Sequence, residues 1–225
     1  MPRRKTLRIA TFNVNGIGTR LPQLLDWLHR ESPDVVALQE LKATDAAFPA
    51  AALEGAGYGA LWQGEARWNG VALLARGATP VESRRRLPGE PKDTQSRYLE
   101  AAAHGIVVGA LYLPNGNPQP GPRFDYKLRW MARLIRHARS LVELPHPALL
   151  LGDFNVIPTE ADVYDPKAWR RDALFQPEVP SSGCSRRAGP MRCERCTATP
   201  RSTPSGTISA NMPSATVGCA SIICC

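Results

Sequence analysis

Apolar and polar positions divide the first 179 residues into short strands and two helices. Period-two alternation or short apolar runs predict strands at residues 7–12, 35–38, 71–75, 98–103, 106–112 and 148–151. Apolar residues at helical spacing predict a helix over 22–29, where Pro22 suits a first turn, and a longer helix over 125–144. Two packed sheets flanked by helices would satisfy this α/β pattern, although periodicity alone does not fix that layout.

The character of the chain changes near Pro180. Residues 180–225 contain no Leu, Phe, Trp or Tyr, and they hold all six Cys of the chain. Such a segment cannot bury enough apolar surface to offset its ordering entropy, so we expect it to be disordered. The sequence therefore predicts a truncated domain over residues 1–179, followed by a tail over residues 180–225.

Net charge gives a weaker signal. The formal charge is +8, but residues 180–225 hold five Arg and one Glu, so the first 179 residues carry +4. That bias is compatible with a DNA partner without establishing one. The chain has no run of eighteen apolar residues, so the sequence predicts no membrane span. The lack of Cys in residues 1–179 and of a signal-like start favours a cytoplasmic enzyme.

Polar residues follow four of the predicted strands, where each strand ends and a loop begins. They are Asn13 after the first strand, Glu40 after the second, Tyr112 as the last residue of the strand 106–112, and Asp153 with Asn155 after the last strand. Active sites of layered α/β folds are commonly assembled at such strand ends. We therefore expect these side chains to converge.

Phosphodiester hydrolysis needs a set of this kind. Mg²⁺ typically takes one or two carboxylates plus waters, and Glu40, which ends an apolar strand, is the best candidate ligand. Asp153 could serve as general base toward the attacking water. Asn13 and Asn155 could donate to phosphate oxygens or orient the base without adding negative charge. The alternative for each is ordinary, namely a solvated strand-end carboxylate or turn-forming Asn residues.

Six motifs, taken together and in this order, resemble exodeoxyribonuclease III of the endonuclease/exonuclease/phosphatase superfamily. They are Thr-Phe-Asn-Val-Asn-Gly (11–16), Leu-Gln-Glu-x-Lys (38–42), Asn-Gly-Val-Ala-Leu-Leu (69–74), Tyr-x-Pro-Asn-Gly (112–116), Phe-Asp-Tyr-Lys-Leu-Arg-Trp (124–130) and Gly-Asp-Phe-Asn-Val (152–156). The resemblance spans residues 7 to about 179. It implies a four-layer αββα sandwich, incomplete at the C-terminus, with Mg²⁺ (or Mn²⁺) at one end.

The resemblance also implies roles for individual residues. Glu40 would ligate the metal with Asn13 beside it, and Tyr112 would face the scissile phosphate. Asp153 would orient or activate the water, and Asn155 would contact the phosphate.

Three further positions look like DNA contacts in this resemblance: Arg97, Asn115 and Lys127. For Arg97 and Lys127 the alternative is surface charge on a strand and a helix. The activity that the resemblance implies is DNA repair by a monomer acting on double-stranded DNA, with cleavage 5′ of abasic sites and removal of nucleotides from 3′ ends.

Two other functions remain open. One is a different superfamily phosphodiesterase or phosphatase, such as a phosphoinositide phosphatase or a secreted DNase. The Asn-x-Asn-Gly element, Lys42 and the lack of Cys in residues 1–179 argue against it. The other is a non-catalytic DNA-binding fragment.

The tail departs from the family, which carries an Arg-Ile-Asp element and then a Ser-Asp-His element where this chain has neither. Cys193 and Cys196 have the spacing of half a zinc site, but no His accompanies them in the tail. Reading the coding DNA one base out of phase instead turns every Cys into a possible Leu and permits an Arg-Ile-Asp-His-Leu-Leu run. We therefore expect a frameshift after about Val179 and a chain that is inactive as written.

Overall fold

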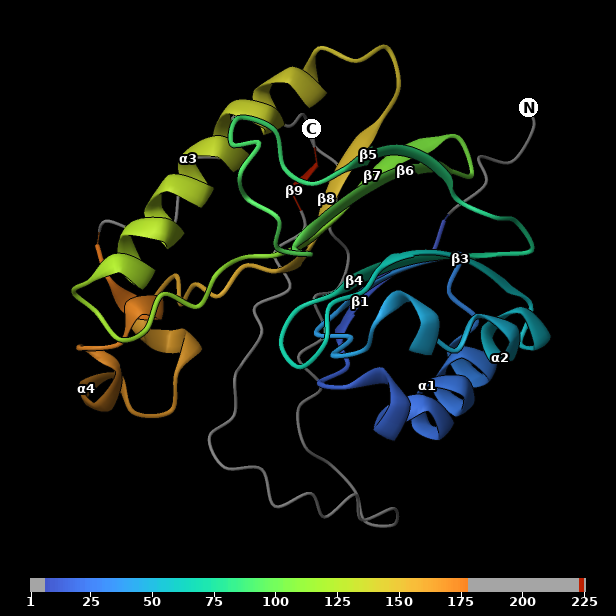
Figure 1. The fold of residues 1–225 in the computed structure, drawn as a ribbon, viewed down its shortest axis with the longest axis horizontal. Helices are drawn as coiled ribbons and strands as arrows, with labels where there is room; N and C mark the ends of the chain where they lie inside the picture. The colour runs from blue at the N-terminus through green and yellow to red at the C-terminus, as the bar shows by residue number, and fades with distance from the viewer. Residues whose placement is uncertain (1–6, 178–222, 225) are drawn as a thin grey trace.

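Two β-sheets stacked face to face form the centre of the molecule (Figure 1). The structure, a computed structural model, describes residues 7–177 and 223–224. The first sheet has the order β1-β2-β4-β3, and only β1 and β2 run parallel. Its strands are β1 (Ile9–Asn13), β2 (Val35–Gln39), β3 (Tyr58–Gln63) and β4 (Val71–Arg76).

The second sheet has the order β5-β6-β7-β8-β9, and only β7 and β8 run parallel. Its strands are β5 (Val81–Arg85), β6 (Tyr98–Ala103), β7 (Ile106–Tyr112), β8 (Ala148–Asp153) and β9 (Ile223–Cys224). The two parallel pairs matter for function, because parallel strands deliver their carboxyl ends to the same edge of a sheet.

Helices cover both outer faces of the paired sheets (Figure 1). The α-helices are α1 (Ile17–Glu31), α2 (Ala50–Gly55), α3 (Pro122–Val142) and α4 (Pro166–Trp169). Three 3₁₀ turns are η1 (Asp45–Ala47), η2 (Glu160–Asp162) and η3 (Ala173–Phe175). α1 and α2 lie against the first sheet, and α3 lies against the second.

Three apolar cores confirm the four-layer αββα arrangement. On β2, Val36 and Leu38 pack with residues of α1 and α2, whereas Val35 and Ala37 face the second sheet. A third core fills the space between the second sheet and α3, where Trp130 is the largest buried side chain. Successive side chains of a strand point to opposite faces, so one short apolar run serves two cores at once.

The sequence pattern located six of the strands and placed the starts of both predicted helices too late, by five residues for α1 and three for α3. Pro22 lies inside α1 rather than in its first turn, because the helix begins five residues earlier at Ile17. The strands β3 and β5 and the helix α2 were not expected. β5 is exposed along its whole length and is polar apart from Val81, so it carries no apolar alternation to reveal it.

The buried face of α3 differs from the one that its apolar residues predict. Besides Trp130 and Met131, it buries three basic residues: Lys127, Arg133 and His137. Each of the three makes polar contacts inside the protein, which offset the cost of taking it out of water. Hydrophobic spacing alone could not reveal these partners, because they come from distant segments of the chain.

Two residues of the tail are described, and they form β9, which pairs antiparallel with Leu149 and Leu150 of β8. The expectations of a disordered, frameshifted and zinc-free tail otherwise concern residues outside the described segments, and they stay predictions. Among the helices of the described segments, none is both long and apolar enough to cross a membrane.

Candidate active site

The expected site residues meet where β1, β2, β7 and β8 end. In the parallel pairs, Asn13 lies opposite Gln39, just before Glu40, and Tyr112 lies opposite Asp153. Because the two sheets are stacked, these four strand ends form one cluster. Hydrogen bonds among Asn13, Glu40, Tyr112 and Asp153 bring these four side chains together.

Gly152 allows β8 to approach β7 closely just before the site. A Cβ atom at this position would lie 1.9 Å from the carbonyl oxygen of Leu111, and its φ of 152° is rare for other residues. Only glycine fits this approach without displacing the backbone. The close pairing sets Asp153 beside Tyr112.

The Asn13 amide joins the two carboxylates of the site. Its Nδ2 donates to Glu40 Oε1 at 3.1 Å and to Asp153 Oδ2 at 2.9 Å. The Tyr112 hydroxyl donates to the same Glu40 oxygen at 2.6 Å. One neutral donor group thus holds two acidic side chains from different sheets in a fixed relation.

The backbone around Glu40 adopts an unusual conformation. Glu40 and Lys42 have φ values of 54° and 49°, in the left-handed region that residues of these types seldom occupy. Lys42 Nζ then lies 3.0 Å from Glu40 Oε2. Such outliers persist where surrounding structure enforces them and are common at functional sites. Lys42 was not among the expected site residues, although it belongs to the Leu-Gln-Glu-x-Lys motif.

The two carboxylates have opposite electrostatic environments. Burial raises the pKa of Glu40, but hydrogen bonds from Tyr112, Asn13 and Lys42 outweigh that effect and leave it below its ordinary value. For Asp153, burial dominates over the hydrogen bonds from Asn155 and Asn13, and the pKa lies above its ordinary value. Glu40 is therefore held as an anion, and Asp153 accepts a proton more readily.

Tyr112 stays protonated in this setting. Burial and the adjacent Glu40 carboxylate raise the pKa of its hydroxyl far above the ordinary value. The guanidinium carbon of Arg97 lies 5.0 Å from the centre of the Tyr112 ring, and Arg97 also donates to the Tyr112 carbonyl oxygen at 3.2 Å. Arg97, which the resemblance implies is a DNA contact, thus lies directly beside the cluster.

Asn155 and Asn115 flank the site in different ways. Asn155 is buried, its Nδ2 donates to Leu113 O at 2.7 Å, and its backbone N–H donates to Asp153 Oδ1 at 2.9 Å. One of its amide protons remains for another acceptor. Asn115 is exposed, and its Oδ1 accepts from the backbone N–H of Asn117.

Lys127 requires a correction. It was expected to contact the DNA backbone, but its side chain is fully buried, with 0% exposure. Its Nζ donates to the carbonyl oxygens of Asn115, Asn155 and Ala173 at 3.1, 2.7 and 2.9 Å. An ammonium group has three protons, so none remains for a phosphate. Lys127 instead ties together three loops beside the site, and burial lowers its pKa to about 8.

The donor set suits a hard divalent cation. Glu40 supplies an ionised carboxylate and the Asp153 carboxyl group lies nearby, which suits Mg²⁺ because it takes only one or two carboxylates from a protein. Within residues 7–177 and 223–224, no group of three or more His, Cys, Asp or Glu side chains is gathered tightly enough to hold a metal. A cation here would keep several water ligands.

Comparisons with known proteins agree with this site and fold. Residues 10–215 match the family model described as endonuclease/exonuclease/phosphatase family. The chain is 32% identical to exodeoxyribonuclease III of Haemophilus influenzae, covering 70% of this chain and 60% of that protein. The structure superposes on a Neisseria 3′ phosphatase bound to a product DNA hairpin with a TM-score of 0.73 and 37% identity, over 77% of this chain and 68% of that one.

An AP endonuclease from Archaeoglobus fulgidus is similarly close, with a TM-score of 0.72 and 34% identity over 77% of this chain and 67% of that one. The chain spans between 57% and 66% of the length of three curated relatives that it matches, among them the exodeoxyribonuclease III of Haemophilus influenzae. The match to the family model, which covers most of the chain, confirms the resemblance seen in the motifs. This chain belongs to the endonuclease/exonuclease/phosphatase family.

Proposed function

We propose that this protein derives from a divalent-metal-dependent DNA-repair nuclease that cleaves 5′ of abasic sites and removes nucleotides from 3′ ends. The observation that carries the proposal is the Asn13 amide, which joins Glu40 and Asp153 at 3.1 and 2.9 Å. Relatives named exodeoxyribonuclease III and AP endonuclease support the choice of DNA as substrate.

In this proposal the two carboxylates have separate tasks. Asp153, whose pKa is raised by burial, takes a proton from the water that attacks the phosphorus. The bond from phosphorus to the leaving 3′ oxygen then breaks, and that oxygen takes up a proton from solvent, giving a 3′ hydroxyl and a 5′ phosphate. Asn13 keeps Asp153 oriented, and the backbone N–H of Asn155 holds its second oxygen.

Glu40 is the proposed ligand of the cation, Mg²⁺ or Mn²⁺. When bound, such a cation stabilises the negative charge that develops on the phosphate oxygens. The Tyr112 hydroxyl and the Asn13 amide hold Glu40 in place. Arg97 and the exposed Asn115 are proposed to contact the DNA strand beside the scissile phosphate.

The chain as written is proposed to lack this activity or nearly so. The family elements Arg-Ile-Asp and Ser-Asp-His are not found in its sequence. Groups of one active site act as a unit, so losing one member can cost about as much as losing several.

The test is to express two versions side by side: the chain as written, and a version from DNA corrected by one base near codon 179. Each is assayed on three DNA substrates, namely an abasic-site duplex, a recessed 3′ end and a 3′-phosphate end, with Mg²⁺ and with a chelator. We expect the corrected version to cleave the abasic-site duplex only with Mg²⁺, and the written version to be slower by orders of magnitude.

Other outcomes would change the proposal. Release of 3′ phosphate without strand cleavage would identify a phosphatase instead. Metal-independent cleavage by the corrected version would contradict the role of Glu40. Equal rates for the two versions would show that residues 1–179 hold every essential group.

A further inference from the structure

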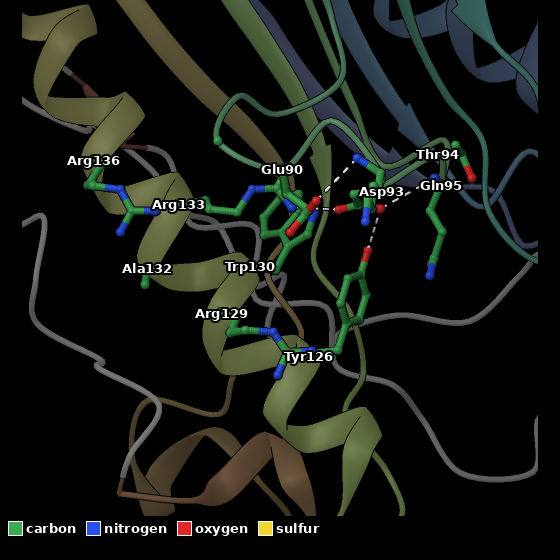
Figure 2. A pocket seen from close by; sticks show the side chains of 12 residues that line it. Glu90, Asp93, Thr94, Gln95, Tyr126, Arg129, Trp130, Ala132, Arg133 and Arg136 are labelled. Carbon is green, nitrogen blue, oxygen red and sulfur yellow. Dashed lines mark hydrogen bonds and ion pairs between the residues drawn. The ribbon is translucent and has the colours of Figure 1, made fainter.

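A pocket of about 470 Å³ lies between α3 and the loop that joins β5 to β6 (Figure 2). On α3 the lining includes Tyr126, Arg129, Arg133 and Arg136. These positions follow each other at spacings of three, four and three residues, so they lie along one face of the helix. The opposite wall is formed by residues 89–95 of the loop.

The wall of this pocket is fixed by a buried ion pair. Arg133 NH1 lies 2.7 Å from Asp93 Oδ2, and both side chains are only 6% exposed. Arg133 also donates to the carbonyl oxygens of Leu87 and Pro88, and the Tyr126 hydroxyl donates to Asp93 at 2.9 Å. Figure 2 shows Tyr126 and Arg133 converging on Asp93. The loop is therefore held against the helix, and the pocket is preformed.

The remaining charge of the pocket is positive. The Arg133–Asp93 pair is neutral as a unit, which leaves Lys92, Arg129 and Arg136 against Glu90. Arg129 and Arg136 are exposed, and within residues 7–177 neither has a carboxylate at ion-pair distance. Seven residues of helix separate them, which corresponds to about 10 Å along the axis.

The pocket also adjoins the catalytic cluster. Gln95, at its rim, accepts a hydrogen bond from Arg97 Nε at 2.6 Å. Arg97 in turn lies over the ring of Tyr112, whose hydroxyl is bonded to Glu40. The pocket is thus connected to the cluster around Glu40 through Gln95 and Arg97.

We propose that this pocket binds the phosphate backbone of DNA beyond the scissile position, with Arg129 and Arg136 as the contacting residues. The inference rests on the proposed nuclease function and extends it. Two cations about 10 Å apart suit a polyanion with repeated charges better than a single small anion. Their continuity with Arg97 favours the bound DNA strand over an acidic polypeptide.

Salt dependence of DNA binding tests this inference. Both the full chain as written and the frame-corrected version would be titrated with a duplex carrying a stable abasic-site analogue, in chelator to prevent cleavage, over a range of salt concentrations, and the variants below are made in the frame-corrected version. Each phosphate contact contributes about 0.9 to the slope of log K against log salt. We expect the double variant Arg129→Gln/Arg136→Gln to lower that slope by about one to two. The lysine double variant, Arg129→Lys/Arg136→Lys, should largely restore it.

Arg139→Gln is the matched control, because Arg139 is exposed on the same helix but does not line the pocket. It should keep the parent slope. Shortening the duplex on one side of the abasic site should weaken binding by the parent, but should weaken binding by the double variant much less.

The outcomes separate this inference from the proposed function. If the corrected version cleaves DNA but the double variant keeps the parent slope, the pocket inference is wrong and the nuclease proposal stands. If binding shows the expected slope change without any cleavage, the pocket inference stands alone. If polyglutamate binds to the parent but not to the double variant, and the two proteins have equal salt slopes for DNA binding, an acidic polypeptide is the partner. Lack of DNA binding contradicts both proposals.

Discussion

Two glutamates with similar hydrogen bonds have different surroundings in this protein. Glu40 accepts from the Tyr112 hydroxyl, the Asn13 amide and Lys42. Glu100 accepts from Tyr98, His137 and Ser83 at 2.8, 2.8 and 3.0 Å. In both cases burial raises the pKa, and the hydrogen bonds outweigh it and leave the pKa below its ordinary value.

The difference lies in where each carboxylate is placed. Glu100 is in the middle of β6, where its side chain is 8% exposed. Glu40 follows the end of β2, its side chain is 17% exposed, and Asn13 links it to a second carboxylate. The number and type of hydrogen-bond donors around a carboxylate therefore do not by themselves identify a functional acid. We propose that position at a strand end, partial access and a neighbouring acid distinguish Glu40 as the functional acid, and the predictions below test this distinction.

The largest effect is expected for Asp153→Asn in the frame-corrected protein. Without a proton acceptor, turnover of an abasic-site duplex should fall on the order of 10²-fold or more, with DNA binding retained. Single-turnover cleavage and binding titrations measure the two quantities. Asp26→Asn, on the exposed side of α1, is the control and should match the parent. Near-parental turnover of Asp153→Asn would reduce this residue to a turn former.

Glu40→Gln tests the metal half of the site. We expect cleavage to fall by orders of magnitude and to need far more Mg²⁺, because an amide is a weaker ligand than a carboxylate. Cleavage is measured against Mg²⁺ concentration. Glu100→Gln is the matched comparison and should keep the parental metal dependence per folded molecule. An unchanged metal dependence in Glu40→Gln would remove it from the ligand set.

Lys127→Met extends the comparison to a buried cation. Three carbonyl oxygens would lose their donor, and unsatisfied buried groups cost about 1–3 kcal/mol each, part of which the removal of a buried charge offsets. We expect the free energy of unfolding to fall by roughly 2–4 kcal/mol in urea titrations. Lys167→Met, at an exposed position of α4, should change it little. A variant as stable as the parent would show that the three loops hold without Lys127.

Glu100→Gln should lower stability by a smaller amount, about 1–3 kcal/mol at neutral pH, because one amide oxygen replaces a carboxylate that accepts three hydrogen bonds. Urea unfolding measures this loss. Glu54→Gln, which is exposed on α2, is the control. If both variants are equally stable, the cluster around Glu100 contributes nothing to the fold.

The smallest effect concerns pH. Since the pKa of Glu100 is lower in the folded than in the unfolded chain, its charge stabilises the fold above the ordinary value of 4.5. That contribution is lost as the pH falls through the folded pKa. The gap in stability between parent and Glu100→Gln should therefore narrow in acid, as urea unfolding at several pH values would reveal. A gap that widens in acid would mean that the sign of the shift is wrong.

The sequence by itself determined the family, most of the strands and the four residues Asn13, Glu40, Tyr112 and Asp153 of the candidate site. These features are local. Glu40 directly follows β2, whose sequence is mostly apolar, and Gly152 and Asp153 follow the apolar run at the start of β8. The polar residues at the ends of these strands can be recognised in the sequence as short motifs. Within each sheet, the meeting of Asn13 with Glu40, and of Tyr112 with Asp153, could be expected because parallel strands end at the same edge of a sheet. The contacts between the two pairs depend on how the two sheets stack, which only the tertiary structure shows.

Tertiary structure alone decided which basic residues face inward. In the sequence, Lys127 and Arg133 look like the exposed Arg129 and Arg136 of the same helix. Their burial depends on carbonyl and carboxylate groups supplied by segments 12 to 46 residues away. A charge can be buried only where partners offset its lost hydration, and those partners exist only after the chain has folded.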